Sequence, residues 1–155
     1  MSKRAVLLKA LAATPNDLAR LLRSSAATAD PPPGHWTAAQ VAAHLADVET
    51  HYRRRLQRVV AEDRPQLPYI HPDESAYDPA LSAAAWLGRF RTERAATLAF
   101  LEGLSPGAWQ RPAVHQTWGP TTLRFLVQSL VEHDTNHLNQ IARLADGRTA
   151  QETTS

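Results

Sequence analysis

The chain has 155 residues, of which 43% are hydrophobic and 21% charged, and its formal net charge at pH 7 is +2. This composition is typical of a globular domain with one substantial core, and no apolar run reaches the ~18 residues that a membrane-spanning helix needs. The small net charge argues against nucleic-acid binding, and the absence of cysteine leaves histidine, carboxylate or water as ligands for any metal ion.

The first predicted helix covers residues 3–23, where leucines recur with helical spacing. A break is expected at Thr14-Pro15, because Thr14 can cap a new helix start and Pro15 suits its first position. The segment is amphipathic and lacks the continuous apolar stretch and cleavage site of a secretory signal, so a cytoplasmic location is expected. A proline-rich loop at residues 29–34 ends this part of the chain.

The second predicted helix covers residues 38–60 and has the clearest start signal in the chain. Thr37 and Gln40 match a capping box, in which each residue binds the backbone N–H of the other. Trp36, just before the cap, is placed to pack on Val41 as a hydrophobic staple.

A long connection at residues 61–78 separates the second helix from the third. It contains three prolines and several charged residues, and no strand pattern stands out there or elsewhere. Asp78 and Pro79 suit the N-cap and first turn of a third helix, which is expected to end near Gly103.

A second irregular stretch precedes the fourth predicted helix. This helix is expected to begin near Thr121 or Thr122 and to end before Gly147, which suits the residue after a helix end. The domain prediction is one helical bundle at residues 1–148 followed by a short C-terminal tail at residues 149–155.

Four helices in a chain of this size predict an all-α four-helix bundle. The long connection can carry the chain back along the bundle, so that the second and third helices run parallel in an up-down-down-up order. His44 lies ~10 Å from the start of the second helix, and His137 and His133 lie ~12 and ~18 Å from the end of the fourth. These levels nearly coincide if the second and fourth helices are antiparallel, which supports the same topology.

Those three histidines form the candidate site. His133 and His137 are four residues apart and therefore share one face of the fourth helix. Both belong to its apolar stripe, and His44 belongs to the apolar stripe of the second helix. Three neutral imidazoles at one level can hold a divalent transition metal and leave positions open for water or substrate.

Other polar residues have several possible roles, and the sequence does not choose among them. The candidate acceptors for the second ring nitrogen of the ligands are Asp47, Glu132 and Gln140. A run of arginines has the solvated face of a helix as its ordinary interpretation and phosphate binding as the alternative; its members are Arg53, Arg54, Arg55 and Arg58. His51 is too far along the helix to share the ion, while His115, Trp109 and Trp118 are expected to cover one end of the bundle.

Two segments, GHWTAAQVAAHLADVE and EHDTNHLNQIARL, resemble the signatures of the DinB/YfiT-like family. DESAY, FRTERAATLAFLEGL and WGPTTL also fit in order and spacing, so the similarity covers about residues 5–147. The resemblance implies an up-down-down-up four-helix bundle, a metal held by His44, His133 and His137, and a frequent homodimer. Characterised members of that family include S-transferases and isomerases that use low-molecular-weight thiols.

The charge of such a site indicates its chemistry. Three neutral imidazoles leave zinc, nickel or iron its full positive charge, which lowers the pKa of a bound water to about 7 or holds a thiol as thiolate. We therefore predict a metal-dependent enzyme, S-transferase-like or hydrolase-like, that directs a thiol or water at a small electrophilic substrate. The alternatives are a non-catalytic metal- or ligand-binding dimer with a stress-response or regulatory role, and nucleic-acid binding through the arginines.

Overall fold

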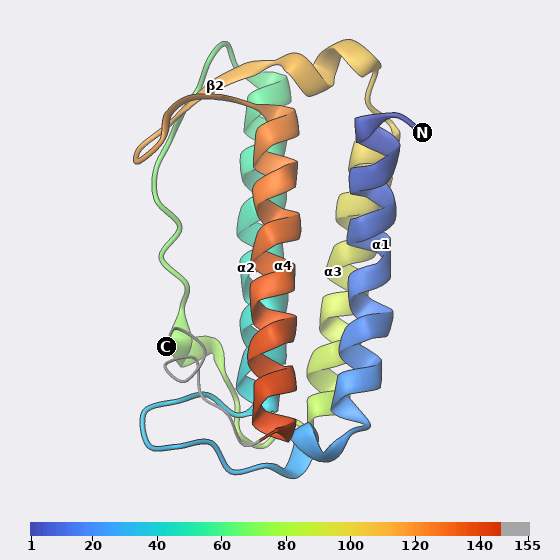
Figure 1. Ribbon diagram of the computed structural model, residues 1–155. Helices are drawn as coiled ribbons and strands as arrows, with labels where there is room; N and C mark the ends of the chain where they lie inside the picture. The colour runs from blue at the N-terminus through green and yellow to red at the C-terminus, as the bar shows by residue number, and fades with distance from the viewer. Residues whose placement is uncertain (147–155) are drawn as a thin grey trace.

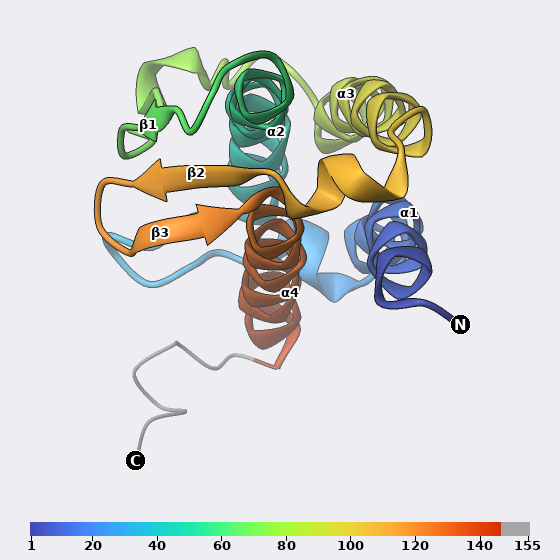
Figure 2. The ribbon, with the colours of Figure 1, turned by 90° about the horizontal axis from the view of Figure 1, so that it is seen from above.

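A computed structural model of the chain describes residues 1–146; the predicted tail at 149–155 and the predicted helix-end residue Gly147 lie outside the described residues. The described part is built on four long helices (Figure 1), whose bounds are α1 (Lys3–Leu22), α2 (Ala38–Ala61), α3 (Ala83–Glu102) and α4 (Leu123–Ala145). Both α1 and α2 pack against α3 and α4, so the four helices form a square in the view along the bundle (Figure 2).

The predicted topology is confirmed. Helices α1 and α4 run in one direction and α2 and α3 in the other, because residues 62–82 carry the chain back along the whole length of the bundle (Figure 1). The second and fourth helices are therefore antiparallel, as the depths of the histidines require. Among the described residues, no helix is long and apolar enough to cross a membrane.

Side-chain caps define where most of these helices begin. The predicted capping box is present. The backbone N–H of Gln40 donates to Thr37 Oγ1 at 3.2 Å, and the backbone N–H of Thr37 donates to Gln40 Oε1 at 2.8 Å. Thr122 caps α4 at the predicted position. Trp36 packs on the apolar cluster that contains Val41, in keeping with its predicted place beside the cap.

The predicted start of the third helix at Asp78-Pro79 is wrong. The Asp78 carboxylate accepts a hydrogen bond from the N–H of Ala80, and its carbonyl accepts one from Leu81, so Asp78 stabilises a separate turn. The helix begins at Ala83, because the Ser82 hydroxyl caps the N–H of Ala85. Both residues are good caps by type, and the local hydrogen bonds decide between them.

The predicted break at Thr14-Pro15 is also wrong, since α1 continues through Pro15. Proline has no N–H to donate to the carbonyl four residues earlier, which here belongs to Leu11. That carbonyl instead accepts a hydrogen bond of 2.8 Å from Nη1 of Arg94 in α3. A side chain from another helix thus replaces the missing backbone donor.

A small sheet lies at one end of the bundle, to the side of α2 and α4, where no strand was expected (Figure 2). Its strands are β1 (Gln66–Leu67), β2 (Pro112–His115) and β3 (Gly119–Thr122). β2 pairs parallel to β1 and antiparallel to β3, so the sheet ties the long crossover to the segment before α4. Strands of two to four residues, two of them containing proline, carry too little alternation to be recognised in a sequence.

The core is divided by a polar layer. One apolar cluster includes Leu11, Val48 and Leu130, and the other includes Leu18, Leu45 and Ile141. Buried polar residues lie between the two clusters on each helix in turn: Thr14 on α1, Glu49 on α2, Arg94 on α3 and Asp134 on α4. The three histidines lie on α2 and α4 close to this layer in sequence.

Candidate metal centre

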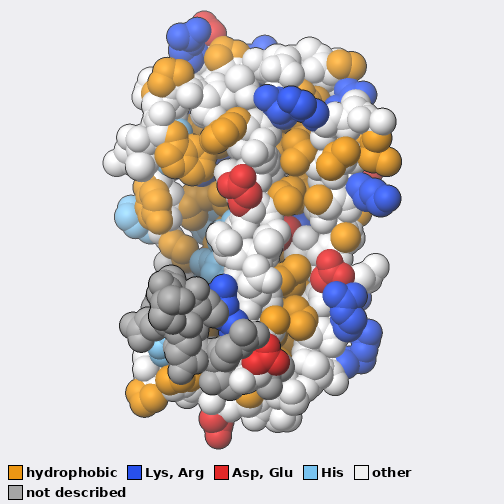
Figure 3. Space-filling view, in the orientation of Figure 1, with side chains coloured by type: hydrophobic (Ala, Val, Ile, Leu, Met, Phe, Trp, Pro, Cys, Tyr) orange, Lys and Arg blue, Asp and Glu red, His pale blue; other side chains and the backbone are white. Residues whose placement is uncertain are grey.

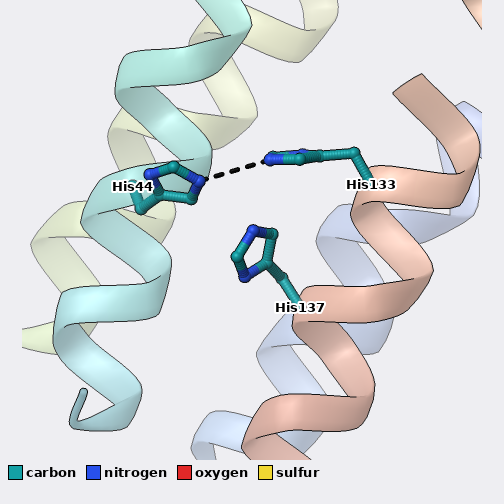
Figure 4. Close-up of side chains that lie close together, drawn as sticks. All are labelled: His44, His133 and His137. Carbon is teal, nitrogen blue, oxygen red and sulfur yellow. Dashed lines mark hydrogen bonds between the residues drawn. The ribbon is translucent and has the colours of Figure 1, made fainter. Parts of the chain in front are cut away.

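The structure brings His44, His133 and His137 together. One ring nitrogen from each lies within 4.8 Å of the corresponding nitrogens of the other two, and all three side chains are partly buried. Figure 4 shows His44 on α2 and the two α4 histidines turned toward one another across the gap between the helices. The i, i+4 spacing on α4 and the antiparallel packing of α2 produce this meeting point, as expected from the sequence.

The donor set fits a divalent transition metal. The Nε2 atoms of His44 and His133 are 3.2 Å apart. Two nitrogens that each lie ~2.1 Å from one ion at a tetrahedral angle are ~3.4 Å apart, so this separation is close to that of two ligands. An all-imidazole set of three suits zinc, nickel, copper or iron and does not suit calcium or magnesium, which prefer oxygen.

The surroundings keep the imidazoles neutral. Burial lowers the pKa of His44 to about 4, and the nearby His137 lowers it further, against a small opposing effect of Asp47. Burial, the two other histidines and Arg94 lower the pKa of His133 to about 3. Burial also lowers the pKa of His137, although Gln140 and Asp134 oppose the shift. Only neutral imidazole has a lone pair to donate, so the protein holds these side chains in the ligating form.

A hydrogen bond orients one of the rings. His137 Nδ1 lies 2.8 Å from Gln140 Oε1, and because an amide oxygen can only accept, Nδ1 carries the proton and Nε2 has the lone pair. Of the three candidate acceptors, Gln140 is thus the one in place. Asp47 instead lies near His51 and accepts from the N–H of Asp73, and Glu132 contacts Gln128.

The buried Nδ1 of His133 has no hydrogen-bond partner among the described residues. The His133 ring is instead held through its Nε2, 3.2 Å from Nε2 of His44, and its ring centroid lies 6.1 Å from that of Tyr52.

A buried ion-pair network lies beside the histidines, and the sequence analysis missed it. Arg94 donates two hydrogen bonds to Glu49 (2.7 and 2.9 Å) and two to Asp134 (2.8 and 3.0 Å), and all three side chains are at most 3% exposed. Thr14 adds a 2.7 Å bond to Asp134. Burial alone would lower the pKa of Arg94, but its two carboxylate partners raise it.

Two carboxylates and one guanidinium give this network a formal charge of −1. Because Asp134 directly follows His133 on α4, the negative charge lies next to the place where a cation would bind. One signal in the sequence could have revealed this network. On each of α2, α3 and α4, a charged residue stands on the apolar face of the helix, and this placement indicates a buried charge.

The histidines open onto a cavity of about 390 Å³. Its other walls include Tyr52, Arg55, His115 and Trp118, and the chain of the long crossover. Figure 3 shows histidine side chains reaching the surface on the left side of the molecule, among hydrophobic ones. This volume falls in the range of ~300–1,000 Å³ that is usual for small-molecule sites.

The remaining candidates are divided between the cavity and the rest of the molecule. His115, buried in β2, stacks on Trp118 with the ring centroids 3.9 Å apart, and both line the cavity. Trp109 is buried in the core instead. His51 lies 3.7 Å from Asp47 and is not among the clustered histidines.

Comparisons with known proteins agree with this geometry. The family model of the DinB superfamily matches residues 4–141. Among solved structures, the chain is similar to YfiT from Bacillus subtilis, described as a probable metal-dependent hydrolase with an unusual four-helix bundle topology. The two are 22% identical, with 96% of this chain and 91% of that chain covered and a TM-score of 0.79, a likeness that shows the fold. No curated protein sequence matches the chain.

Proposed function

Since the chain belongs to the DinB superfamily, we propose that it is a metal-dependent enzyme that catalyses nucleophilic transfer to a small electrophilic substrate. The observation that carries the proposal is the convergence of three neutral imidazoles at the wall of a cavity of substrate size. A bound zinc, nickel or iron ion would supply a water or a thiol that is deprotonated at neutral pH.

The protein residues have separate tasks in this proposal. His44, His133 and His137 hold the ion and do not transfer protons, because their lone pairs are engaged. Gln140 fixes the His137 ring, and the buried network beside α4 offsets part of the charge of the ion. The aromatic walls of the cavity exclude water from the substrate, which strengthens the electrostatic interactions inside.

Water and thiol remain the two candidate nucleophiles. The similarity to YfiT, a probable metal-dependent hydrolase, favours water. The volume of about 390 Å³ beside the histidines supports a low-molecular-weight thiol as co-substrate as the alternative. An experiment with and without added thiol is therefore needed to choose between the two nucleophiles.

A non-catalytic role is the second candidate, and one observation favours it. The ligands come from α2 and α4, so a bound ion would link two helices that are far apart in sequence. Any species that binds only the folded state stabilises it, so a metal could be retained for stability or sensing alone.

The experiment begins with elemental analysis of protein purified without a histidine tag. Metal-loaded protein is then screened against electrophilic esters, amides and epoxides, with and without added thiol. We expect stoichiometric metal and turnover, both abolished in His137→Ala and both retained in His51→Ala, which removes an imidazole outside the cluster. An inactive panel together with a large metal-linked rise in melting temperature would favour the binding protein.

A further inference from the structure

The arginine run on α2 does not form one solvated face. Arg53 pairs with Glu93 at 2.6 Å, and Arg58 pairs with Glu62 at 2.7 Å. Arg54 is exposed. Arg55 differs from all of these, because it is only 7% exposed and lines the same cavity as the three histidines. The ordinary interpretation of the run is therefore right for Arg54 and wrong for Arg55.

Arg55 is a buried cation with no counter-charge among residues 1–146. Within the described part of the chain, no carboxylate lies within ion-pair distance of it, whereas the similarly buried Arg94 has two. Arg55 Nη2 donates to the carbonyl of Pro68 at 2.6 Å, and its buried Nε has no partner among the described residues. A buried, unpaired guanidinium is unfavourable unless something else supplies the negative charge.

A second residue with a free donor lines the same cavity as Arg55. His115 Nδ1 accepts hydrogen bonds from the N–H groups of Thr117 (3.0 Å) and Trp118 (3.2 Å), so the proton of the neutral ring is on Nε2. Burial lowers the pKa of His115, and the positive charge of Arg55 lowers it further, so both effects favour the neutral ring. Both residues line the cavity.

The Tyr52 ring lies close to both Arg55 and His133. Its centroid is 5.8 Å from Arg55 Cζ and 6.1 Å from the centroid of His133. Because both distances are about 6 Å, the guanidinium and the His133 ring lie within about 12 Å of each other. One small molecule can therefore contact both groups at once.

We propose that Arg55, with His115, binds a carboxylate of the substrate in the cavity that the three histidines also line. The inference deepens the proposed function, on which it rests, by giving the substrate class: a small, extended monocarboxylate whose electrophilic atom lies away from its acid group. A guanidinium binds a carboxylate through two parallel hydrogen bonds. One unpaired positive charge matches a monoanion better than a phosphate dianion.

A purely structural role for Arg55 makes a different prediction. Its bond to Pro68 holds the crossover against α2, and this uses only one of its five N–H donors. If that were its whole role, replacing Arg55 would change stability and leave the preference for anions unchanged.

The test compares a carboxylate with its neutral amide. Binding of 4-phenylbutyrate and of 4-phenylbutyramide is measured by calorimetry on the protein as purified and after treatment with EDTA. We expect the carboxylate to bind about ten-fold more tightly or better in both forms, since charge-assisted hydrogen bonds are worth at least that factor. Arg55→Gln should abolish the preference. The matched control Arg54→Gln removes the same charge one residue away, from an exposed position, and should keep it.

Each outcome decides the question. Should Arg55→Gln not fold, as checked by circular dichroism, Arg55→Lys serves instead and should reduce the preference by weakening carboxylate binding alone. Equal binding of acid and amide, an equal loss in Arg54→Gln, or tighter binding of 3-phenylpropyl phosphate would overturn the proposal. So would a preference that EDTA removes and Arg55→Gln retains, because the carboxylate would then be binding to the metal. Absence of turnover leaves these results unaffected, so failure of the enzyme proposal is separable.

Discussion

Replacing Arg94 with methionine should destabilise the protein strongly. The change leaves Glu49 and Asp134 buried without their counter-charge, and removing one partner of a buried pair costs about 3–5 kcal/mol. It also removes the donor to the Leu11 carbonyl, which costs about 1–3 kcal/mol more where no water replaces it. We therefore expect a loss of about 4 kcal/mol or more, a large part of the ~5–15 kcal/mol that stabilises a typical domain.

The measurement is urea unfolding of EDTA-treated protein at pH 7, followed by far-UV circular dichroism. Arg91→Met is the matched control, because Arg91 lies on the same helix and, within residues 1–146, its side chain makes one exposed hydrogen bond, to Asn16. It should change the free energy of unfolding by less than about 1 kcal/mol. Adding Glu49→Gln and Asp134→Asn to Arg94→Met should recover part of the loss, because a buried amide is less costly than a buried unpaired carboxylate.

A free energy of unfolding of Arg94→Met within about 1 kcal/mol of that of the unmodified protein would show that the two buried carboxylates do not need their counter-charge. If Glu49→Gln and Asp134→Asn restore no stability to the Arg94→Met variant, its lower free energy of unfolding comes from lost packing and not from uncompensated charge.

Three further predictions follow from the site. Gln140→Leu removes the acceptor at His137 Nδ1 and should weaken metal binding by about 10- to 100-fold in competition with a chelating dye, while Gln128→Leu on the same helix should not. In metal-free folded protein, the pKa values of His44 and His133 are about 4 and about 3, so both rings stay neutral at pH values where the imidazoles of the unfolded chain take up protons. The free energy of unfolding should therefore fall as the pH drops from 6.5 toward 4. A constant urea midpoint between pH 7 and 5 would contradict this prediction. The predicted homodimer should sediment at twice the chain mass of 17.1 kDa, and a monomer at all concentrations would exclude it.

Features that depend on neighbouring residues were predicted well from the sequence. The capping box at Thr37 and the cap at Thr122 were placed correctly, because both are closed within four residues. The three histidines were brought together by helical spacing and by one topological choice. Helix periodicity also contains the position of Arg55, which follows Val48 and Tyr52 on one face, although the run of arginines around it hid this pattern.

Features that depend on distant residues were not predictable. The continuity of α1 through Pro15 requires an arginine 79 positions later in the chain, and no local rule connects the two. The network of Glu49, Arg94 and Asp134 joins three helices, and each member alone resembles a surface residue. The sheet depends on pairing between Gln66–Leu67 and Val114–His115, which only the folded chain brings together.

The proline in α1 has an evolutionary consequence through Arg94. In a homologue with any other residue at position 15, the backbone N–H of that residue binds the carbonyl at position 11. The arginine at position 94 then has only the two carboxylates as hydrogen-bond acceptors. Such a homologue should accept a lysine at position 94 more readily, whereas lineages that keep the proline should keep the arginine. Proline in the first helix and arginine in the third are thus expected to be inherited as a pair.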